Sequence, residues 1–184
     1  MEEVRVDLRT RRTIKAIKGA FSQLVLEKNY SDISITELAK RAEINRKTFY
    51  LHYSSLDDLV NDIEREIVET FLKSIEKELS ELDVAGCISK FYHYLNDCDD
   101  VQKKLLCDTD YTFFYDNVTT MLLESKPFKA FYENKRHPYV VKAYCVTITS
   151  IYKSWLVNGR PTPIDELIDY TCDLILHGYD GANL

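Results

Sequence analysis

Polar and basic side chains gather in the short segment from Asn45 to His52. Asn45 is a favourable helix N-cap, and the residues after it are Arg-Lys-Thr-Phe-Tyr-Leu-His. We expect Phe49 to face inward, so that its neighbours point outward. Arginine and lysine bind guanine edges or phosphates, threonine contacts a thymine methyl group or a phosphate, and tyrosine and histidine suit phosphate oxygens. The predicted chemistry is recognition of double-stranded DNA, and the residues that carry it are Asn45, Arg46, Lys47, Thr48, Tyr50 and His52.

A helix of about two turns is not stable by itself, so other elements must hold this one. Upstream, Ser34 is a good N-cap, and Glu37 three residues later completes a capping box. Small Ala39 on the inward face lets another helix approach closely. Residues 33–53 therefore predict two short helices joined by a tight turn, which is how a helix is presented to the major groove. Ser34 and Thr36 would offer hydroxyl and amide groups to a phosphate.

This part of the chain resembles the DNA-binding domain of the TetR family of bacterial transcriptional regulators. The similarity extends over residues 10–60 and includes an opening helix over 13–26. It continues through Ile-Thr-Glu-Leu-Ala at 35–39 and Thr-Phe-Tyr-Leu-His-Tyr at 48–53. The resemblance implies a homodimer that binds a palindromic operator, with a repressor as the expected role.

The chain departs from the family pattern at three positions. Glu43 stands where the family usually has a turn glycine, and Asn45 replaces a common serine, which also caps a helix well. Leu56 stands where the family usually has a lysine that contacts a phosphate. One contact to the DNA backbone is therefore in question here.

The chain as a whole has few helix breakers. It contains five glycines and four prolines in 184 residues, and apolar residues recur at a spacing of three or four. We therefore predict an all-α protein. A long helix over 56–81 would begin beside the reading helix and continue into the next domain. The predicted domains are 1–55, a helix-turn-helix DNA-binding domain, and 56–184, a helical effector-binding and dimerisation domain.

Charge is distributed unevenly along the chain. Residues 1–60 contain 11 basic and 9 acidic side chains, a net charge of +2, and residues 61–184 contain 13 and 21, a net charge of −8. The two sum to the total of −6. DNA affinity depends on positive charge near the phosphates and not on the total, so we expect the acidic part to face away from the duplex.

The C-terminal part predicts a helical hairpin. Thr162 can cap a helix over 163–178 that has Pro163 at its first position, and Asn158-Gly159 ends the preceding helix over 138–157. In the resembling family this hairpin packs against its copy in a second subunit; the alternative is that its apolar stripes pack inside the subunit. The expected interface residues are Ile148, Trp155, Ile164, Leu167, Ile168, Thr171, Leu174 and Ile175.

Aromatic residues are concentrated in the middle of the chain. Many must belong to a core, but an aromatic and partly polar cavity would also suit a planar or cationic small molecule. The resembling family has its inducer pocket in this region. The candidate pocket residues are Tyr92, Phe113, Phe114, Phe128, Tyr144 and Tyr152.

A rival interpretation is control by a partner protein, without a small-molecule pocket. The run from Tyr152 to Leu167 is similar to the subgroup that includes an activator of dihydroxyacetone kinase genes. In that case the aromatic interior would be filled core, and an exposed apolar patch would receive the partner.

Other functional classes find little support in the sequence. The isolated glycines make neither a phosphate-binding loop nor a dinucleotide turn, and no hydrolase or metalloprotease motif occurs. The histidines and the five cysteines are scattered without metal-ligand spacing. We expect no catalytic residue, metal or cofactor. The charged N-terminus and the absence of an apolar run of about 20 residues predict a cytoplasmic protein.

Overall fold

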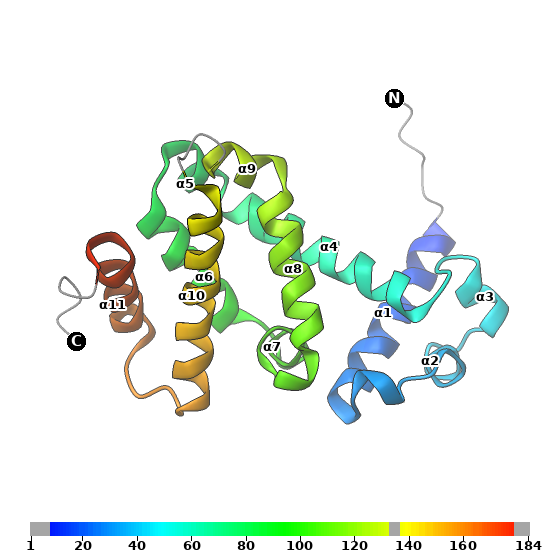
Figure 1. The fold of residues 1–184 in the computed structure, drawn as a ribbon. Helices are drawn as coiled ribbons and strands as arrows, with labels where there is room; N and C mark the ends of the chain where they lie inside the picture. Colours follow the sequence, from blue (N-terminus) through cyan, green and yellow to red (C-terminus); the bar gives the residue numbers. More distant parts are fainter. Residues whose placement is uncertain (1–7, 133–136, 179–184) are drawn as a thin grey trace. The chain divides into compact units, whose positions relative to one another are not determined.

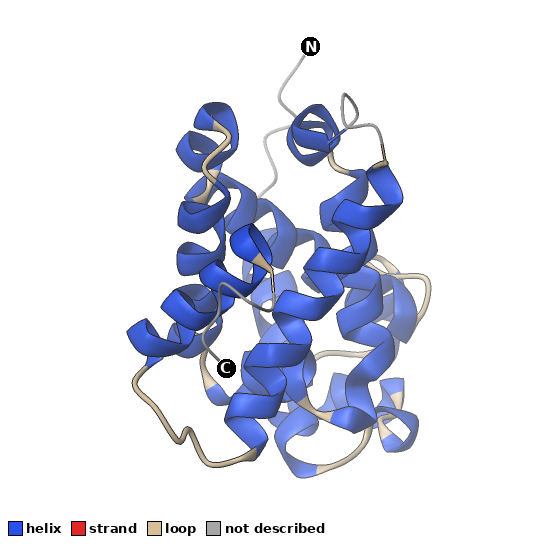
Figure 2. Cartoon of the chain, turned by 60° about the vertical axis from the view of Figure 1, so that its left-hand side comes forward, coloured by secondary structure: helices blue, strands red, loops and turns tan. Residues whose placement is uncertain are grey.

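Helices make up the regular secondary structure of this protein. The structure is a computed structural model that describes residues 8–132 and 137–178. Figure 2 shows helices joined by loops, with no strand among those residues. The prediction of an all-α fold is confirmed.

Figure 1 labels the α-helices in chain order. Their bounds are α1 Leu8–Glu27, α2 Ile35–Arg41, α3 Arg46–Tyr50, α4 Leu56–Ser74, α5 Glu76–Glu81, α6 Val84–Asp97, α7 Asp100–Cys107, α8 Thr112–Glu124, α9 Lys126–Tyr132, α10 Pro138–Val157 and α11 Ile164–His177. Short 3-10 helices cover Tyr30–Asp32 (η1) and Thr109–Tyr111 (η2). The helices predicted over 138–157 and 163–178 correspond to α10 and α11. The N-cap of α11 is Pro163 and not Thr162, whose carbonyl oxygen instead accepts a hydrogen bond from the indole nitrogen of Trp155 at 3.0 Å.

The helix predicted over 56–81 is interrupted at one residue. Helix α4 ends at Ser74, and Ile75 has φ −112° and ψ 11°, outside the helical region, before α5 begins. The Ser74 hydroxyl donates to the carbonyl oxygen of Phe71 at 2.6 Å, a local bond that competes with helix continuation. The side chain of Ile75 is fully buried. Apolar spacing alone does not reveal this break, because the periodicity continues across it.

The chain forms two compact units that alternate along the sequence. Unit 1 comprises the described residues up to Glu66 together with Asp99–Asp116, and unit 2 comprises Ile67–Cys98 and the described residues from Asn117 onward. Helices α4 and α8 each contribute residues to both units. The functional division at residue 55 stays a prediction, because compactness does not show which residues perform which function.

The core of unit 1 forms around α1. Ile17, Phe21 and Leu24 lie on one side of that helix and are completely buried, as are Leu38 of α2 and Phe49 of α3. Burying a side chain of this size contributes roughly 1.5–3 kcal/mol to folding. This core supplies the support that the two short helices need.

Polar contacts fix α1 to the first half of α4. The Lys18 ammonium lies 2.6 Å from Asp62 and 2.7 Å from Glu66. The Tyr53 hydroxyl donates to Asp62 at 2.8 Å, just after α3. Partial burial of Asp62 opposes its ionisation, but the hydrogen bonds from Lys18 and Tyr53 outweigh this and hold the pKa of the carboxyl below its usual value. The orientation of α3 is therefore tied to both long helices of the unit.

Unit 1 also includes the segment after α6. Helix α7 packs on α1, and the Tyr111 hydroxyl donates to the carbonyl oxygen of Lys28 at 3.0 Å. The rings of Tyr30 and Phe113 lie 5.0 Å apart. A segment that is distant in sequence thus belongs to the same compact unit as α2 and α3.

Unit 2 has an aromatic and aliphatic core. Tyr92 of α6 is fully buried, its hydroxyl donates to the carbonyl oxygen of Ile148 at 2.8 Å, and it lies 3.1 Å from the hydroxyl of Thr171. These bonds connect α6 with α10 and α11, and α11 packs against α6. A second group of buried residues joins α4, α5, α8 and α9: Phe71, Ile75, Leu79, Leu123 and Phe128.

Candidate nucleic-acid interface

Helix α2 begins with the cap that the sequence predicts. The Ser34 backbone is extended, and its hydroxyl accepts a hydrogen bond from the amide of Glu37 at 3.2 Å. The other half of the predicted capping box is replaced, because the Glu37 carboxylate accepts bonds from the Lys28 ammonium at 2.9 and 3.0 Å. Glu37 thus ties α2 to the end of α1. Ser34 and Thr36 are exposed at the start of α2.

The turn between α2 and α3 is built on a left-handed residue. Glu43 has φ 55°, its amide donates to Lys40 at 3.2 Å, and the amide of Ile44 donates to Ala39 at 3.0 Å. This pair of bonds is the usual way to end a helix on a left-handed residue, a position that favours glycine. A glutamate adopts it at a cost of about 1–2 kcal/mol.

Replacing Glu43 by glycine is therefore expected to stabilise unit 1. The strain that glycine relieves exceeds the stability that it costs, about 0.4–1 kcal/mol, by adding conformational entropy to the unfolded chain. The net gain is up to about 1.5 kcal/mol. Each 1 kcal/mol corresponds to a rise of about 2–4 °C in melting temperature. Circular dichroism melts measure it. The control is Glu69→Gly at an exposed helical position of α4, which should lower the melting temperature; a fall in both variants would contradict the account of the turn.

Helix α3 is short, capped and anchored by one aromatic residue. The Asn45 side-chain oxygen accepts a hydrogen bond from the Lys47 amide at 2.8 Å. The ring of Phe49 is completely buried and lies 5.8 Å from the ring of Tyr53. With the helix held in this way, its outward side chains have a defined orientation.

The outward face of α3 is basic and aromatic. Arg46, Lys47 and Tyr50 are exposed. The Arg46 guanidinium donates to the Tyr50 hydroxyl at 3.0 Å and lies 5.5 Å from the centre of its ring. Within the described part of the chain no carboxylate forms an ion pair with Arg46 or Lys47. Two positive charges are thus presented to the solvent on a rigid helix.

The remaining predicted residues of this segment are less prominent. Thr48 and His52 are half-buried, so they present only part of their surface. Sequence reasoning missed Leu51, which is 80% exposed at the end of α3. Its position four residues after Lys47 places both on one side of the helix, and that spacing was the available signal. These eight candidate residues and Leu51 all lie on α2, on α3 or directly beside them.

The candidate effector residues do not all lie in one unit. Phe113 and Phe114 belong to unit 1 and the other four belong to unit 2. Tyr92 and Tyr152 are fully buried with ring centres 5.4 Å apart. Phe128 is part of the core of unit 2, and Tyr144 is nearly half exposed on α10. An effector pocket among these residues stays a prediction.

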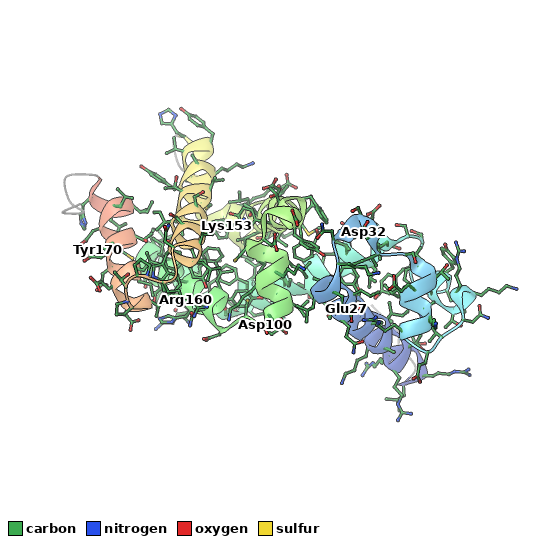
Figure 3. All side chains as sticks on the ribbon, turned by 90° about the horizontal axis from the view of Figure 1, so that it is seen from below. Glu27, Asp32, Asp100, Lys153, Arg160 and Tyr170 are labelled. Carbon is green, nitrogen blue, oxygen red and sulfur yellow. The ribbon has the colours of Figure 1, made fainter. Side chains whose placement is uncertain are left out.

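All eight expected interface residues belong to unit 2, and half of them are buried in it. Trp155, Leu167, Ile168 and Thr171 are buried within the unit, and the other four are half-buried: Ile148, Ile164, Leu174 and Ile175. Trp155 is held by its bond to Thr162. In Figure 3, Arg160 lies in the loop between α10 and α11, and its guanidinium is 5.6 Å from the centre of the Trp155 ring. An interface between two copies that includes these eight residues stays a prediction.

The described residues also bear on metal binding, thiol reactivity and membrane crossing. No three histidine, cysteine, aspartate or glutamate side chains gather there as a metal site. Burial raises the pKa of the Cys87 and Cys145 thiols to about 11, which disfavours the reactive thiolate. In the same part of the chain, each helix is too short or too polar to cross a bilayer.

Sequence comparisons point to regulators. Residues 20–63 match the family model described as bacterial regulatory proteins, tetR family. An uncharacterised HTH-type transcriptional regulator of Bacillus subtilis, YxbF, is 31% identical over 110 residues, which cover 52% of this chain and 29% of that protein. An uncharacterised HTH-type transcriptional regulator of Haemophilus influenzae is 27% identical over 109 residues, which cover 56% of this chain and 52% of that protein. The alignments thus span about half or less of these relatives.

The fold comparison covers nearly the whole chain. The fatty acid degradation regulator FadR of Bacillus halodurans superposes with a TM-score of 0.65. The match covers 92% of this chain and 97% of that one at 16% identity. At this identity the likeness establishes a shared fold: a helix-turn-helix domain followed by a helical domain.

Proposed function

Because the chain belongs to the TetR family of bacterial regulatory proteins, we propose that it is a DNA-binding transcriptional regulator that reads its operator with α3. The observation that carries the proposal is the exposed face of α3. It presents Arg46, Lys47 and Tyr50 on a helix whose inward residue, Phe49, is completely buried. A rigid helix with outward cationic side chains suits the major groove.

Each group on this surface has a distinct role in the proposal. Arg46 and Lys47 reach guanine edges, and Tyr50 and His52 bind phosphate oxygens. The exposed start of α2, with Ser34 and Thr36, supplies hydroxyl and amide donors to a further phosphate. The phosphate contacts set the position of α3, and the base contacts select the sequence. The proposal places the protein in the cytoplasm with the DNA and includes no catalytic step.

We further propose that the reading unit is a homodimer formed through α10. The exposed side of α10 carries small residues, Ala143, Thr147 and Ser150, next to Val146. The Thr147 hydroxyl donates to Ala143 at 3.0 Å, and the Ser150 hydroxyl donates to Val146 at 2.9 Å. Because these hydroxyls are satisfied inside the helix, the face behaves as an apolar surface that a second helix can approach closely. A second copy of α10 is the occupant that we propose.

A symmetric dimer would bind a palindromic operator. Its two α3 helices would lie about 34–36 Å apart, one turn of the duplex. A change of a few ångströms in this separation prevents both helices from binding at once, and the natural outcome of such control is a repressor released by an effector. Helix α4 has residues in both compact units, so it can carry the change.

The proposed effector is a small molecule bound in the helical domain. One observation favours the alternative, a partner protein: Tyr92 and Tyr152 are fully buried, and their ring centres lie 5.4 Å apart, as in a filled core. Thermal stability measured with a panel of planar and cationic compounds separates these possibilities. A compound that raises the melting temperature and releases DNA supports the small-molecule route.

The DNA-binding proposal is tested by selection from random duplexes. The protein is expected to enrich a palindrome and to bind it at least about 1,000-fold more tightly than random DNA. The affinity is measured by gel-shift titration at a fixed salt concentration. Failure to enrich any sequence over several rounds would contradict the proposal.

Replacing Leu56 by lysine is expected to strengthen DNA binding. Leu56 is the first residue of α4 and is half-buried. One new phosphate contact per subunit makes two per dimer, so the slope of log affinity against log salt should steepen by about 1.8. If Leu56 instead packs in the core, the lysine lowers the melting temperature. Asn61→Lys, at an exposed position further along α4, is the matched control. An unchanged slope in a folded Leu56→Lys variant would show that this position does not face the phosphates.

A further inference from the structure

The first turns of α1 carry a cluster of positive charge that the reading helix does not explain. Arg9, Arg11, Arg12 and Lys15 are all exposed. At about 100° per residue they occupy the side of α1 opposite the buried Ile17, Phe21 and Leu24. The only carboxylate in the sequence of α1 is Glu27, its last residue. The cluster is therefore a basic surface that is free of acidic neighbours on its own helix.

Six acidic side chains of unit 1 have partners outside this cluster. Asp62 and Glu66 pair with Lys18, Glu37 pairs with Lys28, and Glu27 pairs with Arg41. Asp57 accepts a hydrogen bond from Tyr30, and Asp58 accepts one from Ser54. Among the described residues no ion pair reaches the four basic residues of the cluster.

The cluster is unfavourable for the folded protein alone. Arg11 and Lys15 are four residues apart, and Arg12 and Lys15 are three apart, so like charges lie side by side. The first turn of a helix also disfavours positive charge. A bound polyanion would offset these repulsions, since each contact to a phosphate neutralises one of them.

The cluster lies at the end of unit 1 that also carries α3. In Figures 1 and 3 the beginning of α1 and α3 lie toward the same end of the unit, whereas Glu27, labelled in Figure 3, lies at the other end of α1. Lys18 fixes this geometry by holding α1 to α4 through Asp62 and Glu66. The cluster therefore lies at the same end of unit 1 as the helix that we propose to read the bases.

We propose that Arg9, Arg11, Arg12 and Lys15 form a second DNA-binding surface. It binds the phosphate backbone that flanks the bases read by α3. This inference rests on the proposed DNA-binding function. The contacts are to phosphates, so they add affinity for any sequence and do not select one. Because of these contacts, full affinity requires a duplex that extends beyond the half-site of each subunit.

The test compares two variants that remove the same charge. Arg9→Gln/Arg11→Gln/Arg12→Gln removes three positive charges from the cluster and keeps good helix formers. The matched control is Lys73→Gln/Lys77→Gln/Lys126→Gln, which removes three exposed positive charges from unit 2. Circular dichroism melts check that both variants are folded. Binding to the selected duplex and to a random duplex is measured at several salt concentrations.

The cluster variant is expected to lose at least one phosphate contact per subunit. Its salt slope should then be shallower than that of the parent by about 1.8 or more, and the control should keep the parental slope. Affinity should fall by the same factor for the selected and the random duplex, so the ratio between them is unchanged. Shortening the duplex from both ends should weaken the parent before it weakens the cluster variant.

Two results would overturn the inference and leave the proposed DNA-binding function intact. The first is a cluster variant that keeps the parental slope, the result expected if Glu2, Glu3 and Asp7 of the sequence neutralise the cluster. The second is a loss of affinity equal to that of the control, which would show an effect of net charge alone. If the parent itself selects no duplex, the proposed function fails, and that outcome is recognised before any variant is made.

Discussion

Replacing Lys47 by alanine is expected to weaken binding to the selected duplex by about 10- to 100-fold. A good contact to a base edge is worth about 1–3 kcal/mol, and each 1.4 kcal/mol is a factor of ten. Lys47 is exposed, and only its backbone amide serves the cap of α3. The melting temperature should therefore change by no more than about 2 °C. Gel-shift titration and circular dichroism melts measure the two quantities.

Tyr50→Phe and Lys73→Ala complete this comparison. The phenylalanine keeps the ring but removes the hydroxyl to which Arg46 donates, so its loss should be smaller than that of Lys47→Ala. Lys73 is an exposed lysine of unit 2, and its removal should leave affinity unchanged. If Lys47→Ala and Tyr50→Phe both bind like the parent, α3 is not the reading element.

Replacing Val146 and Ser150 by glutamate is expected to give a monomer that binds the operator at least about 100-fold more weakly. Two carboxylates on the small-residue face of α10 would meet the same two carboxylates of the second copy. A dimer binds its second half-site as an intramolecular step, and losing this step costs a factor of 10² to 10⁴. The parent should show twice the 21.5 kDa mass of one chain in light scattering, and the variant should show that mass once.

The control for the interface carries the same charge elsewhere. Ser80→Glu/Thr120→Glu places two carboxylates at exposed positions of α5 and α8. This variant should remain a dimer with nearly parental affinity. The parental interface should bury more than about 1,200 Å². A parent that is monomeric at micromolar concentration would rule out the dimer, whatever the variants do.

Local rules predicted α2 and α3 well because their signals are short-range. The caps at Ser34 and Asn45 form bonds to amides two or three residues away, and the structure contains both. The left-handed turn at Glu43 occurs where the family pattern has glycine. Here the backbone geometry is kept although the residue that best suits it is absent.

Long-range partners were harder to predict. The sequence predicted that Glu37 completes the cap of its own helix. In the structure its carboxylate instead accepts hydrogen bonds from the Lys28 ammonium, because a nearby ammonium is a stronger donor than a neutral amide. The break at Ile75 lies inside an uninterrupted apolar pattern. The burial of Trp155 and Thr171 depends on how α10 and α11 pack on α6, which the pattern of one helix does not specify.

Protection of guanine N7 from methylation tests the central claim most directly, because this atom lies in the major groove. On the selected duplex, the protein should protect guanines in two half-sites whose centres are about 10–10.5 base pairs apart. The protection should disappear with Lys47→Ala at concentrations where the parent protects fully. Two results at saturating protein would contradict a dimer that reads the major groove with α3. One is that no guanine of the duplex is protected although the half-sites contain guanines, and the other is that only one half-site is protected.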